Sequence, residues 1–454
     1  MKLKKTFALL TLAGISASSF ATNGMDLEGY GPVAAAMGGA SFAYDNGAGA
    51  MMNNPATLGL MGQGSGIGVA LGFLGPDVNA SSAKSGGDAY YMPAIGYVTR
   101  HGALTYGIGV YSQGGMGTEY DASSPMAYGT GDKIRSEVGV GRVILPLAYN
   151  VNDQLIIGGS LDFVWATMDM KMAASTPQFM AMATGNMSPG FGNMLMNPGS
   201  GLISRFGADA FRIDFSDNNA FSGKASGSGF AGKLGLVYKL SPSLSVGATY
   251  HAKTHLGDMT TDANGASFSA FKSGTPLGPA VTGKITIHDF QWPETYGFGL
   301  AYQVNENWLV AADYKRIDWS GVMQDFRMTF STGSDYADFR ISQNWNNQNV
   351  LMIGASYRMS DTLTLRFGGN FANNPVPDNR VNPLFPAIIK DQYTLGMGYL
   401  LTRRSGIDLS LVYAPKVTVT GTQTVNVPYS GAPDNATTIT HSQLNWQLQY
   451  GYHF

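Results

Sequence analysis

Few residues of this chain are of the types that carry chemistry, and they are scattered along it. The sequence has no cysteine, which excludes disulfides, thiolate metal sites and cysteine nucleophiles. His251 and His255 are four residues apart and would share a metal ion on a helix, but on a strand they lie about 13 Å apart. We find no nucleophile motif and no clustered acid/base set. The sequence therefore predicts no catalytic residue, no metal site and no cofactor, so we do not expect an enzyme.

Methionine is the one potentially functional residue type that is locally dense. Residues 168–196 hold 8 of the 23 methionines, beginning with Met168, Met170 and Met172. Thioether side chains are flexible and polarizable, which suits a surface that binds varied hydrophobic molecules. A Met-x-Met run also suits Cu(I), and a third interpretation is that these methionines only fill a loop. We favour substrate contact for Met168, Met170 and Met172.

The elements that position these residues are predicted to be strands. The chain of 454 residues is 13% charged, 44% hydrophobic and 11% aromatic, with 60 glycines and a mean hydropathy of −0.04. A soluble protein has about 25% charged residues, and a bundle of membrane helices would be far more apolar. This composition favours a membrane β-barrel, whose strands have one apolar and one polar face. The net charge of −2 argues against a nucleic-acid partner.

The last dozen residues show the strand pattern most clearly. Apolar residues alternate strictly with polar or small ones: Leu444, Trp446, Leu448, Tyr450, Tyr452 and Phe454 against Gln443, Asn445, Gln447, Gln449, Gly451 and His453. The first set suits a lipid face with interfacial aromatics, and the second suits a wet lumen. A final strand ending in Phe454 also resembles the assembly signal of bacterial outer-membrane barrels, so we expect the outer-membrane assembly machinery as a partner.

The same period predicts an all-β, 14-stranded antiparallel transmembrane β-barrel over residues 64–454. The predicted strands lie at 64–75, 88–100, 103–118, 133–150, 154–171, 224–240, 243–262, 281–304, 307–331, 338–359, 362–374, 389–403, 406–420 and 441–454. The connections between them alternate between short and long. Outer-membrane barrels have short periplasmic turns and long external loops. With an even number of strands, both chain termini are therefore expected on the periplasmic side.

The N-terminus predicts secretion to the bacterial outer membrane. A basic start (Lys2 to Lys5) is followed by an apolar stretch at 7–15 and by small residues at a cleavage site after Ala21. Residues 1–21 are therefore expected to be a cleaved signal peptide. No later segment has about 18 consecutive apolar residues, so no transmembrane helix is expected.

Residues 22–63 lack the period of two and are expected to form a separate hatch. Pro32 begins a helical stretch of small residues, and Asn54-Pro55-Ala56 marks a later break. The segment is either a disordered periplasmic tail or a plug folded inside the barrel. Its apolar residues favour the plug, because a free tail would be more polar.

Three motifs in this order along the chain resemble one family. These are Gly38-Gly39-Ala40 through Asn54-Pro55-Ala56, then Trp292-Pro293-Glu294, then Asn374-Pro375-Val376-Pro377-Asp378 with Arg380. Together they resemble the FadL-like outer-membrane transporters of long-chain fatty acids and hydrocarbons. The resemblance implies passive uptake of hydrophobic molecules, which outer loops capture, a pocket above the hatch holds, and a gap at a kinked third strand releases sideways.

The kink is expected at a glycine cluster in the third strand. Gly114, Gly115 and Gly117 lie near its upper end, and glycine inside a strand marks a bulge or bend. The alternative is ordinary glycine enrichment, which this chain has throughout. We expect the cluster to form the lateral exit.

The resemblance also raises the question of what the pocket binds. Fatty-acid members hold the carboxylate with a basic residue at positions that fall here on Met172 and Ile341, with Lys171 and Arg340 beside them. A shift of one residue exchanges the faces of a strand. If Lys171 and Arg340 face inward, a carboxylate has two partners. If their neighbours do, the pocket is neutral and suits hydrocarbons, and the two cations are solvated loop charges.

We therefore expect a passive channel for long-chain fatty acids or similar hydrophobic compounds, with Lys171 and Arg340 as ligand contacts. The alternative is the same fold carrying neutral monoaromatic or aliphatic hydrocarbons. A barrel lipase and a general porin are weaker alternatives, because the sequence offers no clear catalytic set and the hatch is apolar. The expected surroundings are outer-membrane lipid, with the protein as a monomer.

Overall fold

The computed structural model describes residues 23–219, 222–421 and 437–454. The predicted signal peptide lies outside these residues. Among the described helices, none is both long enough and apolar enough to cross a membrane.

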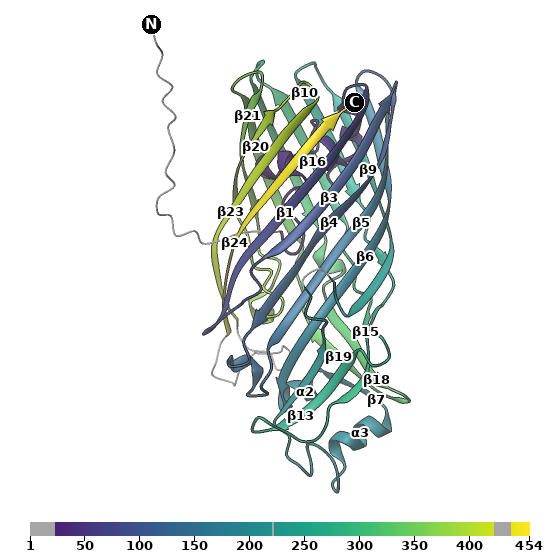
Figure 1. Ribbon diagram of the computed structural model, residues 1–454, viewed down its shortest axis with the longest axis vertical. Helices are drawn as coiled ribbons and strands as arrows, with labels where there is room; N and C mark the ends of the chain where they lie inside the picture. The colour runs from purple at the N-terminus through teal and green to yellow at the C-terminus, as the bar shows by residue number, and fades with distance from the viewer. Residues whose placement is uncertain (1–22, 220–221, 422–436) are drawn as a thin grey trace.

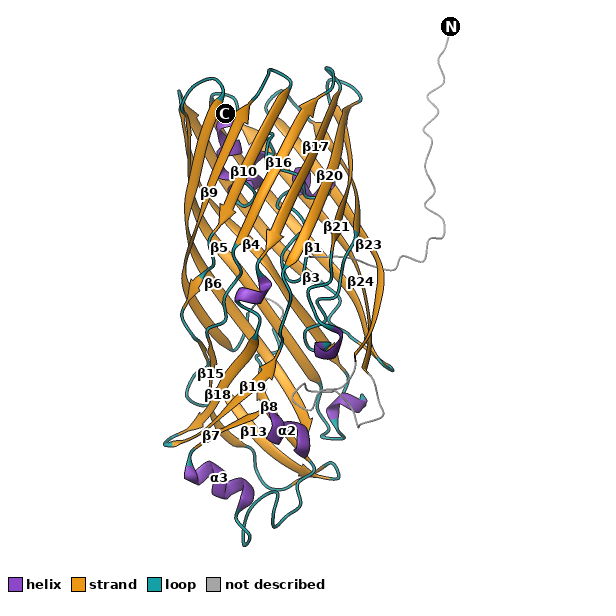
Figure 2. Cartoon of the chain, turned by 180° about the vertical axis from the view of Figure 1, so that it is seen from behind, coloured by secondary structure: helices purple, strands orange, loops and turns teal. Residues whose placement is uncertain are grey.

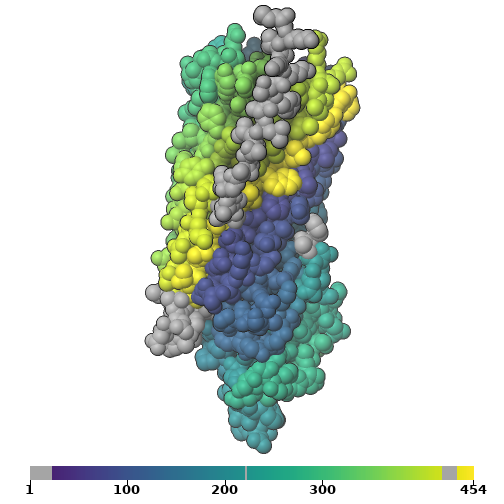
Figure 3. Space-filling view, turned by 60° about the vertical axis from the view of Figure 1, so that its left-hand side comes forward, coloured from purple at the N-terminus to yellow at the C-terminus, as the bar shows by residue number. Residues whose placement is uncertain are grey.

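A closed antiparallel sheet forms the body of the molecule (Figure 1). In order around the wall its strands are β1 (Gly64–Ala80), β3 (Tyr90–His101), β4 (Leu104–Tyr120), β5 (Ile134–Asn150), β6 (Leu155–Ser175), β9 (Ala225–Lys239), β10 (Leu244–His251), β16 (Thr295–Gln303), β17 (Trp308–Ile317), β20 (Gln348–Arg358), β21 (Leu363–Ala372), β22 (Gln392–Leu400), β23 (Ser405–Gly421) and β24 (Thr437–His453). Strand β24 then pairs with β1, so the first and last strands lie side by side on the surface (Figure 3).

The sheet continues beyond one end of this wall (Figure 2). The additional strands are β2 (Ala83–Lys84), β7 (Ala183–Met187), β8 (Ala210–Phe215), β11 (His255–Leu256), β12 (Met259–Thr260), β13 (Ala266–Lys272), β14 (Thr275–Pro276), β15 (Val281–His288), β18 (Asp325–Thr332) and β19 (Asp335–Ser342). Helices α2 (Thr176–Met182) and α3 (Pro189–Met196) lie there, and short 3₁₀ helices occur at η3 (Pro125–Ala127), η4 (Trp319–Gly321) and η5 (Asp378–Arg380). This outer extension is filled by a cluster of buried phenylalanines, among them Phe179, Phe211 and Phe268.

The all-β barrel class agrees with the prediction, but the predicted count of fourteen strands is wrong. The described residues form 24 strands in one sheet, and 18 of them are seven or more residues long. The predicted strands 281–304, 307–331 and 338–359 are each broken in two. The first break contains Pro293, which has no N–H for a sheet. The long connection 172–223 supplies further strands, because β6 runs past β9 and pairs with β8 instead.

Alternation along the wall strands separates a lipid-type outer face from a polar lumen. On β22 the outward residues Tyr393, Leu395, Met397 and Tyr399 are 49%, 58%, 38% and 44% exposed. An apolar band with an aromatic residue at each edge is typical of strands in a bilayer. On β24 the buried Gln447 faces the lumen, as the sequence predicts.

Residues 23–61, which we call the N-terminal segment, are folded inside the barrel. The segment contains α1 (Pro32–Ala36), η1 (Gly47–Met51) and η2 (Pro55–Leu60), and most of it is buried. Asp313 on β17 accepts hydrogen bonds from the backbone N–H groups of Ser41 (2.6 Å) and Phe42 (2.9 Å). These contacts join the segment to the wall. The predicted boundaries of the signal peptide and hatch stay predictions.

Candidate functional site

The wall has a gap between β3 and β4. The two strands pair only from Ile95 opposite Val110 to His101 opposite Leu104, although β3 begins at Tyr90 and β4 continues to Tyr120. A cavity of about 370 Å³ lies at this gap. The cavity is therefore placed where the wall lacks backbone hydrogen bonds between neighbours.

A β-bulge shapes β4 beside the cavity. The pairing of β4 with β5 shifts register between Ser112 and Gly114, so the strand carries an extra residue, Gln113, at this point. Gly115 N–H donates to the carbonyl of Met25 at 3.2 Å, and a Cβ on Gly114 would lie 2.2 Å from the same oxygen. Glycine at position 114 thus lets the backbone of the N-terminal segment reach the bulge.

The three glycines that the sequence predicts as a kink all line the cavity. Gly114 directly follows the extra residue of the bulge, and Gly115 is the next residue along the strand. Gly117 lies next to the hydroxyl of Tyr90, which a Cβ there would meet at 2.2 Å. The register shift therefore lies within the glycine cluster, and the kink itself stays a prediction. The use of this glycine cluster as an exit is taken up below as a proposal.

The inner wall of the cavity is mostly apolar. Leu74 and Val78 on β1 and Val138 and Val140 on β5 line it, together with polar side chains at its edge such as His441 on β24. Among the residues that the structure describes, the lining contains no lysine and no arginine, and Glu137 is its one carboxylate. The cavity thus offers a hydrophobic ligand many apolar contacts and no cationic partner.

The cavity also reaches the outer surface of the barrel. Gly139, Gly141, Trp165 and Thr167 contribute to its lining, and these residues lie on the outward side of β5 and β6. The Trp165 ring lies across Gly141, where a Cβ would be 2.2 Å from the ring. The lining of the cavity therefore includes residues from both the inward and the outward face of the wall.

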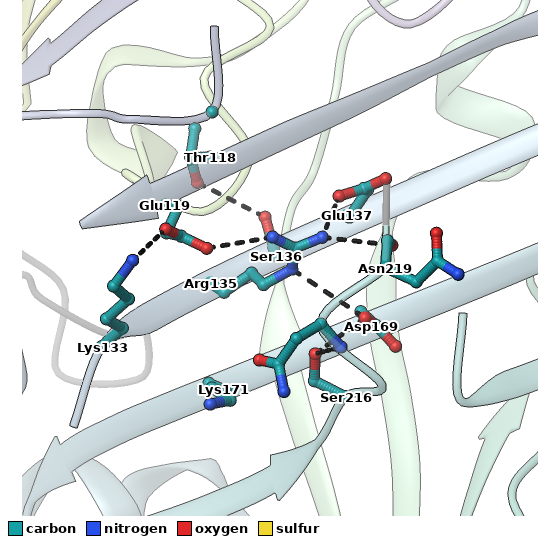
Figure 4. A network of polar contacts seen from close by, with 12 residues as sticks. Thr118, Glu119, Lys133, Arg135, Ser136, Glu137, Asp169, Lys171, Ser216 and Asn219 are labelled. Atoms are coloured by element: carbon teal, nitrogen blue, oxygen red, sulfur yellow. Dashed lines mark hydrogen bonds and ion pairs between the residues drawn. The ribbon is translucent and has the colours of Figure 1, made fainter. Parts of the chain in front are cut away.

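A network of charged residues lies directly beside this outer mouth (Figure 4). Arg135 contacts Glu119 at 3.0 Å, Asp169 at 3.9 Å and the neighbouring Glu137. Lys133 also pairs with Glu119, at 2.6 Å. The guanidinium group of Arg135 therefore links strands β4, β5 and β6 beside the mouth.

The two cations predicted to hold a carboxylate lie outside the cavity and are already paired. Lys171 lies opposite Arg135 on the outward face, and its Nζ is 3.2 Å from Asp132. The side chain of Arg340 is 53% exposed and lies 3.8 Å from Asp325. The structure does not bring either cation to the lumen.

The residues next to these cations face inward instead. Met172 and Ile341 are 2% and 0% exposed, and Met168 and Met170 are equally buried, all within the apolar core of the barrel. These methionines do not line the cavity at the gap. Met172 and Ile341, not the two cations, thus face the interior, which is the alternative for which the sequence predicts a neutral pocket. Substrate contact by the methionines stays a prediction.

The predicted hatch residues anchor the N-terminal segment to the wall. Asn54 Nδ2 donates to the carbonyl of Leu236 on β9 of the wall (3.3 Å) and to that of Phe42 within the segment (2.7 Å). Asn54 Oδ1 accepts from Ala56 N–H (3.1 Å), where Pro55 begins η2. A Cβ on Gly235 of β9 would lie 2.0 Å from Asn54 Oδ1. Glycine in the wall thus allows this close approach of the segment.

A buried polar group that sequence reasoning missed joins the segment to the bulge. Lys315 Nζ lies 3.0 Å from Asp26, and the Tyr30 hydroxyl lies 2.7 Å from Asp26 and 2.6 Å from the carbonyl of Gln113. Glu28 lies beside this group, and burial raises its pKa to about 8. The sequence could have indicated this group by its charged residues at positions expected to face the lumen, because charged residues are few in this chain.

Comparison with known proteins agrees with this geometry. The toluene transporter TodX of P. putida superposes with a TM-score of 0.82 at 30% identity, over 94% of this chain and 99% of that one. The long-chain fatty acid transport protein of Escherichia coli is 21% identical over 361 residues, which are 75% of this chain and 76% of that protein. An uncharacterized protein of Chlorobium limicola is 56% identical over 73 residues. The chain spans little more than a third of the length of the first curated relatives it matches.

The family match extends over nearly the whole chain. The family described as outer membrane protein transport protein (OMPP1/FadL/TodX) matches residues 9–454, which include the N-terminal segment, the bulge and the closing strand. The chain therefore belongs to this family of bacterial outer-membrane transport proteins.

Proposed function

We propose that the protein is a passive channel for small neutral hydrophobic molecules, such as monoaromatic or aliphatic hydrocarbons, which leave the barrel laterally between β3 and β4. The observation that carries this proposal is the apolar cavity of about 370 Å³, which lies at the gap and, within the described residues, has no lysine or arginine in its lining. A carboxylate buried there would lack the partner that a buried charge needs. A neutral hydrocarbon has no such requirement.

The second candidate is transport of long-chain fatty acids, which the name of the Escherichia coli relative supports. The cavity is large enough for a medium-length acyl chain. However, neither cation lines the apolar cavity at the gap. Lys171 pairs with Asp132, and the half-exposed Arg340 lines a separate, polar cavity of about 540 Å³. We therefore rank this candidate below neutral hydrocarbons.

The N-terminal segment is proposed to act as the plug of the lumen. Its burial and its hydrogen bonds to Asp313 support this role, since so wide a barrel would otherwise be open. We further propose that the protein is a monomer, because the sheet closes within one chain. We also propose that it has no catalytic activity, because its family is one of transport proteins. Deletion of residues 23–61 should leave a barrel that inserts and conducts ions in planar bilayers. Low conductance after the deletion would contradict the plug.

The lateral exit is tested by filling its outer mouth. A Cβ on Gly139 meets only Thr167 Oγ1, at 3.7 Å, so Gly139→Phe can place a ring in the mouth without disturbing the backbone. Val143→Phe adds the same ring to the same face of β5, outside the cavity. We expect Gly139→Phe to abolish toluene uptake by cells and Val143→Phe to retain it. Equal uptake by the two variants, both assembled, would exclude this route.

A further inference from the structure

The outward face of β5 changes character at the mouth of the cavity. Arg135 and Glu137 are charged, Gly139 and Gly141 follow, and the apolar band then begins, with Leu145 52% exposed. Charged residues on the outer wall of a barrel belong to the headgroup side of the membrane boundary. Glu137 is therefore the last charged group on the outward face of this strand before lipid, and it lines the cavity itself.

The charge of Glu137 is only partly neutralised. Its partner Arg135 also contacts Glu119 at 3.0 Å and Asp169 at 3.9 Å. The side chains of Glu119, Glu137 and Asp169 thus share two cations, Arg135 and Lys133, and this group of five carries a net charge of −1 when all are ionised. The mouth therefore has an excess of negative charge on its headgroup side.

An amphiphile that leaves through such a mouth must place its parts in a fixed order. Its apolar tail enters the lipid, past Trp165 and Gly139, and its polar head stays at the membrane boundary, beside Glu137. A carboxylate head would then lie next to the carboxylate of Glu137, and like charges repel strongly where water is partly excluded. An uncharged molecule of the same shape meets no such barrier.

We infer that Glu137 sets the charge selectivity of the lateral exit, so that neutral molecules pass and molecules with a carboxylate are retarded. This inference rests on the proposed exit between β3 and β4. At an effective dielectric constant of about 40, between the values for a protein surface and for bulk water, two unit charges about 7 Å apart change a rate about five- to tenfold. Removing the charge of Glu137 should therefore raise the passage of an anionic substrate relative to that of a neutral one by that factor.

The test compares laurate with its methyl ester, two probes of equal chain length that differ in charge. Initial uptake rates are measured at pH 8.5, where both carboxylates are ionised, in cells that lack their own fatty-acid transporter. We expect Glu137→Gln to raise the laurate-to-ester ratio about five- to tenfold. Glu119→Gln is the matched control, because Glu119 belongs to the same network but does not line the cavity. Glu137→Ala provides a second variant if the amide prevents assembly.

The outcomes separate this inference from the proposed function. An unchanged ratio in both assembled Glu137 variants would overturn the filter, and so would an equal rise in Glu119→Gln. If the wild type takes up neither the ester nor toluene, the proposed function itself fails. Normal ester uptake with an unchanged laurate-to-ester ratio would refute the charge filter and leave the proposed function standing.

Discussion

Replacing Glu28 with glutamine should relieve a pH-dependent penalty on the packing of the N-terminal segment. Glu28 is 1% exposed, and among the described residues neither of its carboxylate oxygens has a hydrogen-bond partner. Burial raises the pKa of Glu28 from 4.5 to about 8, against the opposing effects of the backbone N–H of Glu28 itself and of Lys315. The group therefore holds a proton in the packed segment that it would release in water.

The magnitude follows from the two pKa values. A rise from 4.5 to about 8 corresponds to about 5 kcal/mol against the ionised form. Below pH 4.5 the carboxyl is protonated in both states, and Glu28 does not reduce the stability of the packed segment. As the pH rises from 4.5 towards 8, the free energy of unfolding falls by about 1.4 kcal/mol for each pH unit. Above pH 8 the full penalty applies. Because glutamine does not ionise, the stability difference between Glu28→Gln and the wild type should grow by about 3 kcal/mol from pH 5 to pH 8.

Tryptophan fluorescence during chemical denaturation measures this difference. Trp319 packs directly on Gly24, and Trp292 Nε1 lies 3.4 Å from Asp26, so both indoles report whether the segment is in place. Glu306→Gln, in an exposed turn, is the control and should follow the wild type at every pH. Parallel curves for Glu28→Gln and the wild type between pH 5 and pH 8 would refute the reasoning.

Three further predictions concern the contacts of the segment and of the outer surface. Lys315→Met should destabilise the fold by about 3–5 kcal/mol in the same denaturation experiment, because it leaves Asp26 buried without its cation, and adding Asp26→Asn should recover part of the loss. Gly114→Ala should displace the N-terminal segment from the bulge and raise ion conductance in planar bilayers, since its Cβ would lie 2.2 Å from a backbone oxygen. The Lys171→Ala/Arg340→Ala double variant should keep the affinity of the solubilised protein for toluene and for laurate within about twofold, because both cations lie in exposed or partly exposed ion pairs.

The sequence predicts well those features that depend on one strand at a time. The alternation along β24 gives the correct lumen face, from Gln443 to Gln449, because side chains alternate along any strand regardless of its neighbours. The short connections near residues 102, 152 and 242 are also confirmed. They could be predicted because tight turns need small and polar residues, which the local sequence shows. The bulge at Gly114 belongs with these features, because glycine marks it locally.

Features that depend on a partner strand could not be predicted in this way. Nothing in the alternation along β6 indicates that its partner changes from β9 to β8 after Met168, and this change creates strands where a long loop was expected. The same limit applies to Lys171, whose side of the wall depends on a register of one residue. The pairing of Asp26 with Lys315 joins positions 289 residues apart, and single charges carry no sign of such a partner.

The pairing of the first strand with the last has a consequence for biogenesis. Fifteen residue pairs join β1 to β24, from Gly66 opposite His453 to Ala80 opposite Ile439. Until the C-terminal residues arrive, β1 keeps an unpaired edge over all these positions, and such an edge is a template for aggregation. Pairing between segments so distant in the chain is also slow to form. Loss of a few C-terminal residues would therefore remove hydrogen bonds from β1 and β23 together, and the chain must be kept from aggregating until its synthesis is complete.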